Sequence, residues 1–168
     1  VLGADIASGT ATYSGNLTLT KVTTGGTAGA INLKSVQTGG TVDFTGVIAN
    51  DAGAGTVIRD LTIGDATTGL GTVKFSNANT YTGNTIISAG TLTIGGSGSL
   101  NSGSYAGNIV NNATFKYSSS AAQTLSGIIS GTGALTKDAD SSSTLTLSNA
   151  SNSYSGLTTI TSGVVSVT

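Results

Sequence analysis

Short runs of alternating apolar and polar residues recur along the chain and predict β-strands. In each run the aliphatic side chains fall on one face and Thr, Ser or Lys falls on the other, which is the two-residue period of a half-buried strand. The clearest runs are 16–20, 72–76, 91–94 and 143–148. Glycine-rich turns separate them, and no segment keeps the 3.6-residue period of a helix. The pattern therefore predicts an all-β fold.

A long internal repeat indicates which all-β fold this is. Residues 71–95 align with residues 143–168, with one residue inserted in the second copy before Tyr154. The positions shared by the two copies are Asn79, Tyr81, Gly83 and Gly90 in the first, and Asn152, Tyr154, Gly156 and Gly163 in the second. Repetition at a fixed spacing is typical of solenoids, in which each unit stacks on its neighbour.

The repeat extends upstream of these two segments. Residues 44–48 correspond to residues 125–129, and the first copy is longer between the two landmarks. We therefore expect related units at about 42–110 and 122–168 within a single solenoid domain that spans the 168 residues. Insertions of this kind suit a solenoid, because a loop can bulge outward without breaking the stack.

Parallel coils fit the sequence better than hairpins. The two-residue Asn-Gly and Asp-Gly turns that join hairpin strands are absent from the sequence. At roughly 20 residues per coil, the chain of 168 residues predicts a parallel β-helix of about eight coils. The side chains expected to point inward are Val73, Phe75, Leu92, Ile94, Leu145, Leu147, Val165 and Val167.

Composition narrows the function classes. The chain has 26 Gly, no Pro, Cys, Met, Trp or His, and 8% charged residues, against about 25% in ordinary domains. A 37% apolar share with a net charge of −1 does not match the low hydrophobicity and high charge of disordered chains. The balanced charge offers no basic field for nucleic acid. No apolar run approaches the roughly 18 residues of a membrane helix, so we expect no membrane insertion by this segment.

Candidate chemistry is sparse. Without His and Cys the usual nucleophile–base pairs are absent, and no Ser-x-x-Lys motif supports a Ser–Lys pair. All acidic residues are aspartates, at Asp5, Asp43, Asp51, Asp60, Asp65, Asp138 and Asp140. We interpret 137–141 as a solvated turn, with a weak calcium or catalytic site at Asp138 and Asp140 as the alternative. Arg59 and Asp60 are interpreted as an exposed pair. We expect no catalytic residue, no metal site and no cofactor.

The repeated residues are interpreted as structural. Tyr81 and Tyr154 are expected to pack beside the glycine two positions on, with ligand-stacking aromatics as the alternative. The repeated asparagines suit turns and hydrogen bonds from coil to coil. Gly90 and Gly163 are expected to supply a positive φ or a close approach at a corner.

Residues 77–95 and 149–167 resemble the passenger-associated transport repeat of bacterial autotransporters, on the spacing Asn-x-Tyr-x-Gly followed by Gly-x-Leu. The stretch 126–138 resembles the segment that commonly precedes that repeat. Asn84 and Leu157 depart from the family, which usually has Gly there. The resemblance implies a right-handed β-helix passenger that is exported to the bacterial cell surface or the extracellular space.

Two function classes remain. The first is a surface adhesin or spacer that acts in adhesion, toward a host or neighbouring cell, or in end-to-end or lateral self-association. The second is the subunit of an extracellular filament joined by β-strand addition at its ends. The candidate assembly strand is Val164, Val165, Ser166, Val167 and Thr168, which alternates without a polar cap. An ice-binding surface is a weaker alternative, because the Thr-x-Thr triplets at 18–20, 91–93 and 144–146 are irregularly spaced.

Overall fold

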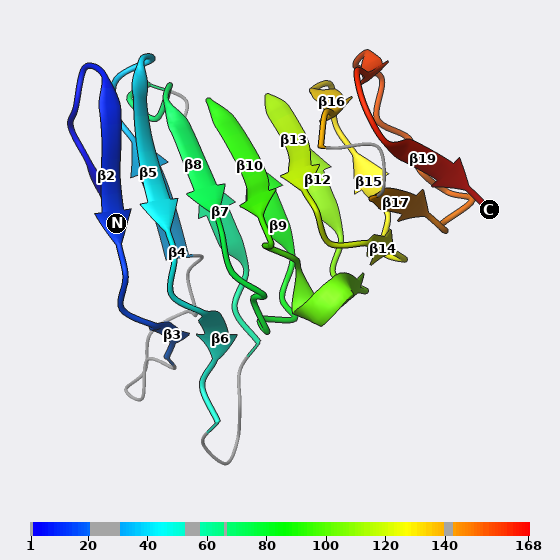
Figure 1. Cartoon of the computed structure of the whole chain (residues 1–168), viewed down its shortest axis with the longest axis horizontal. Helices are drawn as coiled ribbons and strands as arrows, with labels where there is room; N and C mark the ends of the chain where they lie inside the picture. Colours follow the sequence, from blue (N-terminus) through cyan, green and yellow to red (C-terminus); the bar gives the residue numbers. More distant parts are fainter. Residues whose placement is uncertain (1, 21–30, 53–57, 66, 140–142) are drawn as a thin grey trace.

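The chain folds as a parallel β-solenoid. The structure is a computed structural model that describes residues 2–20, 31–52, 58–65, 67–139 and 143–168. The strands lie side by side along the long axis of the molecule (Figure 1), and the pairings between them are all parallel. The helical content of the described residues is a single 3₁₀ turn, η1 (Asn101–Gly103). The predicted all-β parallel solenoid is confirmed.

Three sides of the solenoid are formed by separate sheets. The six-stranded sheet contains β1 (Leu2–Ala4), β4 (Ile31–Ser35), β7 (Leu61–Ile63), β9 (Thr85–Ile87), β12 (Ile109–Asn111) and β15 (Ile129–Ser130). The seven-stranded sheet contains β2 (Gly9–Tyr13), β5 (Gly40–Phe44), β8 (Thr72–Phe75), β10 (Thr91–Gly96), β13 (Thr114–Ser119), β16 (Ala134–Lys137) and β18 (Thr158–Ile160). The third side has a two-stranded sheet, β3 (Leu17–Leu19) and β6 (Ile48–Asn50), and a four-stranded sheet, β11 (Ser104–Tyr105), β14 (Gln123–Leu125), β17 (Thr144–Leu147) and β19 (Val164–Val167).

Coil length varies along the chain. Gly9 pairs with Gly40 and Thr41 pairs with Thr72, so that the first two coils each advance 31 residues. Thr72 then pairs with Thr91, only 19 residues later. The predicted count of about eight coils is not confirmed, because the described residues cross the seven-stranded sheet seven times and the early coils are longer than the assumed 20 residues.

A second repeat, which the sequence analysis missed, underlies this sheet. The pattern Gly-Thr-x-x-aromatic or Ile occurs at 9–13, 40–44, 71–75 and 90–94. Its threonines form one outward column, namely Thr10, Thr41, Thr72 and Thr91, which continues with Thr114. The Thr-x-Thr triplets considered for ice binding instead fall on β3, β10 and β17, which belong to three different sheets.

The inward columns form one continuous hydrophobic core. On one column the rings of Tyr13 and Phe44 stack with centroids 5.3 Å apart, and Phe44 meets Phe75 edge-on at 6.1 Å. Six of the eight predicted core side chains are buried, and each such burial contributes about 1.5–3 kcal/mol. Val165 is only partly buried and Val167 is 76% exposed. The prediction is wrong for Val167, because no described strand stacks on the outer edge of β19.

No helix in the described residues is long and apolar enough to span a membrane.

Candidate functional site

The repeated asparagines make the same contact in both copies. Asn79 Oδ1 accepts a hydrogen bond of 2.8 Å from the Ile48 N–H, and Asn152 Oδ1 accepts one of 2.7 Å from the Ile129 N–H. Ile48 and Ile129 both lie in the preceding coil, two residues after a corner glycine. The asparagine therefore satisfies a backbone donor of the coil below it. The coil-to-coil bond was expected, but its backbone partner was not.

The repeated tyrosines also share a contact. The Tyr81 hydroxyl lies 2.8 Å from Thr85 Oγ1, and the Tyr154 hydroxyl lies 2.8 Å from Thr158 Oγ1. In the first copy Tyr105 joins this network, with its hydroxyl 2.8 Å from Thr85 Oγ1 and its ring 5.7 Å from that of Tyr81. Burial raises the pKa of Tyr81 well above its usual value and raises the pKa of Tyr105 to about 12. The fully buried Tyr81 presents no ring face to a ligand.

The corner glycines are required by the neighbouring coil. A Cβ on Gly83 would overlap the carbonyl oxygen of Arg59, and a Cβ on Gly156 would overlap that of Gly133. The expectation that these glycines make room for their own tyrosines is therefore wrong, because the room is taken by backbone. The positive φ expected at the other two glycines is present, with φ of 69° at residue 90 and 81° at residue 163.

Each repeat pairs its own first and last strands. Thr72 of β8 pairs with Thr91 of β10, whereas Thr144 of β17 pairs with Val164 of β19, 20 residues later. The residue inserted before Tyr154 accounts for the difference between 19 and 20. However, β8 and β10 belong to the seven-stranded sheet and β17 and β19 to the four-stranded sheet. The two repeats are equivalent inside but face different sides of the solenoid.

The family model described as "Passenger-associated-transport-repeat" matches residues 67–94 and 140–167. The chain carries two passenger-associated transport repeats. The resemblance inferred from the sequence is confirmed, and the match indicates a passenger segment of an autotransporter, with a surface or extracellular location. No curated protein and no solved structure matches the chain.

A ladder of Asx side chains runs along one corner beside the first passenger-associated repeat. Asp60 Oδ1 accepts a hydrogen bond of 2.9 Å from the Asn84 N–H, and Asn84 Oδ1 accepts one of 3.0 Å from the Asn108 N–H. Asn108 Oδ1 in turn accepts a bond of 2.9 Å from the Ile128 N–H. The sequence signal for this ladder is the Gly-Asn pair at the corner, which the sequence analysis noted only as a departure from the family at Asn84.

The aspartates do not gather into one site. Three of them bridge neighbouring coils with lysines, as the pairs Lys34–Asp65 at 2.7 Å, Lys74–Asp43 at 2.9 Å and Lys116–Asp138 at 2.6 Å. The solvated-turn interpretation is wrong for Asp138, which is half-buried and also accepts from the Ser118 hydroxyl. Asp140 lies outside the described residues. Within the described ranges, no group of three or more acidic residues could hold a metal ion.

Two cations are more buried than the sequence indicated. Lys137 is fully buried, donates a bond of 2.8 Å to the Ser143 hydroxyl, and lies 5.7 Å from the centroid of the Tyr117 ring. Arg59 is only 5% exposed, so the interpretation of an exposed Arg59–Asp60 pair is wrong. Both cations sit inside the stack rather than on a binding surface.

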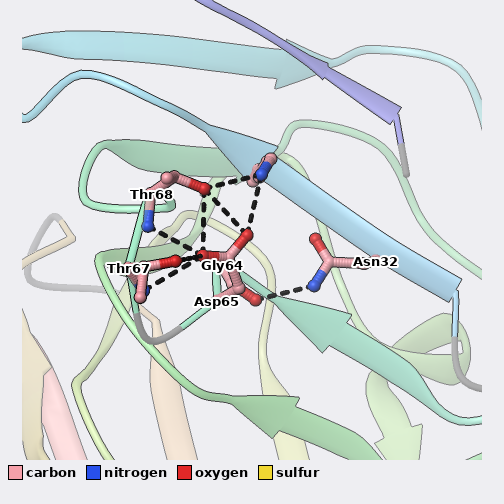
Figure 2. Close-up of polar contacts among 6 residues, drawn as sticks. Asn32, Gly64, Asp65, Thr67 and Thr68 are labelled. Atoms are coloured by element: carbon pink, nitrogen blue, oxygen red, sulfur yellow. Dashed lines mark hydrogen bonds and ion pairs between the residues drawn. The ribbon is translucent and has the colours of Figure 1, made fainter.

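An ordered loop between β7 and β8 accounts for part of the longer first unit. Figure 2 shows Asp65 at its centre, where Oδ1 accepts bonds of 2.7 Å from the Thr68 N–H and 3.1 Å from the Thr67 N–H. The Lys34 ammonium, followed by these N–H groups, holds the pKa of Asp65 well below its usual value. The carboxylate is thereby committed to the loop and the neighbouring coil.

The last coil presents an open edge. The Val164 N–H donates to the Ser143 carbonyl at 3.2 Å, and the Thr168 N–H donates to the Leu147 carbonyl at 3.3 Å. Because successive N–H groups of a strand point to opposite sides, those of Val165 and Val167 point away from β17, where no described strand pairs with β19. Exposed apolar side chains accompany this edge, namely Leu157 at 74%, Ile160 at 53%, Val164 at 49% and Val167 at 76%.

The first coil leaves the interior open at the opposite end. A hollow of about 380 Å³ lies there, lined in part by Leu2, Tyr13, Leu17 and Phe44. The strands of this coil, β1, β2 and β3, each pair with one described strand. The two ends of the solenoid thus both expose backbone edges together with apolar side chains.

Proposed function

We propose that the chain is a non-enzymatic passenger segment of a bacterial surface or secreted protein that acts as a structural rod in adhesion or self-association. The observation that carries this proposal is the use of polar side chains between coils. Asparagines cap backbone donors of the coil below, and three lysines pair with aspartates of adjacent coils. Side chains held in the stack stiffen it and are not available to a substrate.

The shape supports a spacer role. Parallel coils add about 4.8 Å each along the axis, and a solenoid presents an extended surface whose loops can vary without disturbing the core. The outward Thr column on the seven-stranded sheet offers a polar, largely uncharged face that suits contact with a host or neighbouring cell surface.

Beads coated with the chain test the adhesive role. We expect coated beads to attach to cells or to one another, and beads coated with heat-unfolded chain to do neither. The same protein is incubated with acidic and neutral polysaccharides, and we expect no cleavage. Cleavage that Asp138→Ala abolishes, or inert beads, would contradict the proposal.

A second candidate function is a filament subunit joined by β-strand addition at its ends. The specific observation that favours it is the exposed apolar edge of β19, where Val167 is 76% exposed. Partners would then be further copies of the same chain.

A further inference from the structure

We infer that the C-terminal coil of one copy receives the N-terminal coil of a second copy, so that the sheets continue in parallel from copy to copy. This inference rests on the self-association part of the proposed function and names its partner and its geometry. The contact is head-to-tail, because the open edge of β18 and β19 differs from the open edge of β1, β2 and β3.

The inward columns define the register of this contact. One column of the seven-stranded sheet contains Tyr13, Phe44, Phe75, Ile94, Tyr117, Lys137 and Ile160. If the column continues, Tyr13 of the second copy stacks on Ile160, as Phe44 already stacks on Tyr13 within the chain. On the third side Leu17 and Leu19 of β3 would follow the inward valines of β19.

The backbone also matches. The N–H groups of Val165 and Val167 point to the open side of β19, and a parallel strand placed there supplies carbonyl acceptors for them. Because every described pairing is parallel, a second copy stacked in the same orientation keeps the strand direction unchanged. The contact is therefore β-augmentation with the ladder geometry that the solenoid uses internally.

Neither end carries the usual protection against such pairing. Natural edge strands are commonly blunted by Lys, Pro or inward-pointing charges. Residues 143–168 contain no charged side chain, and residues 1–20 contain only Asp5. Asp5 accepts a bond of 2.9 Å from the Gln37 side chain. The charges of this chain instead lie on its middle coils.

The apolar surfaces are complementary in kind. The N-terminal end has a hollow of about 380 Å³ lined by Leu2, Tyr13, Leu17 and Phe44 among others, while Ile160 and Val167 stand exposed at the C-terminal end. A heterologous contact of this type does not close on itself and generates a linear assembly. A second copy thus covers both surfaces with one repeated interface.

The test blocks one end at a time. Val167→Lys places a charge on the exposed edge of β19, and Ser14→Lys places one at the exposed rim of the N-terminal hollow. In sedimentation velocity we expect the unaltered chain to form species that grow with concentration, and each variant alone to stay monomeric. An equimolar mixture of the two variants should form dimers and nothing larger, because one free end of each kind remains.

Circular dichroism establishes that both variants keep the wild-type spectrum and melting temperature, and Ser151→Lys on an exposed loop is the matched control that should still assemble. A monomeric wild type at every concentration would overturn the inference, as would assembly that both end variants leave intact. Stacking that disappears when native flanking sequence is included would also overturn it and identify further coils of the same chain as the occupant. Bead adhesion by the monomeric variants would keep the proposed function while its separate loss would reject that function.

Discussion

Replacing Asn79 with alanine should weaken the solenoid at a defined coil-to-coil joint. The side chain is fully buried and makes three hydrogen bonds: it accepts from the Ile48 N–H at 2.8 Å and donates to the carbonyls of Asn77 at 2.9 Å and Ser99 at 3.4 Å. Alanine at this position removes both the acceptor and the two donors. The Ile48 N–H is then left without its partner inside the stack.

The expected magnitude follows from these contacts. Each lost hydrogen bond costs about 0.5–1.5 kcal/mol net, and a buried donor without a partner costs about 1–3 kcal/mol. Because these terms overlap, we expect Asn79→Ala to lower the free energy of unfolding by about 2–4 kcal/mol. For a chain of this size that corresponds to a fall in Tm of about 5–15 °C.

Asn152→Ala is the matched control. Asn152 makes the equivalent bond to the Ile129 N–H, but it is only half-buried in the last coils, where water can replace the lost acceptor. We expect its cost to stay below about 1 kcal/mol. Urea unfolding followed by circular dichroism compares the variants, and hydrogen exchange at the Ile48 amide reads the joint directly. Equal costs for the two variants, or unchanged exchange at Ile48, would refute the reasoning.

Three further predictions concern backbone and burial. Ser102 is exposed with φ of 52°, so Ser102→Gly should raise the free energy of unfolding by up to about 1 kcal/mol in urea titration; a loss would contradict the strain. Gly83→Ala drives a Cβ into the Arg59 carbonyl, and should cost about 1–3 kcal/mol by thermal melting; wild-type melting would show that the coil can yield. Burial raises the pKa of Tyr105 and Tyr117 to about 12, so the stability they contribute is present below about pH 10 and lost as the pH rises toward 12, which absorbance at alkaline pH can follow; normal titration of all tyrosines would count against it.

Local patterning was sufficient to predict the strands. The runs at 72–76, 91–94 and 143–148 correspond to β8, β10 and β17, because alternation specifies which side chains face inward whatever the neighbours are. The aligned repeats also correctly indicated parallel stacking. Alternation could not show that Val167 lacks a covering strand, since burial depends on the next coil.

The repeat glycines illustrate what the sequence determined by itself. Their spacing was enough to locate the corners and the positive φ at residues 90 and 163, because a left-handed backbone is a local requirement that glycine meets without strain. The passenger-associated repeats were recognisable for the same reason. Each contains its own pair of stacked strands within about one coil.

Only the tertiary structure decided which coil lies against which. The close approach of the Arg59 carbonyl to Gly83, the bond from the Ile48 N–H to Asn79 and the burial of Lys137 all join residues of different coils. Coil length varies from 19 to 31 residues, so these partners do not follow from a constant period. The same variation turns the second repeat onto another side of the solenoid, because the intervening coils do not return the chain to the same face.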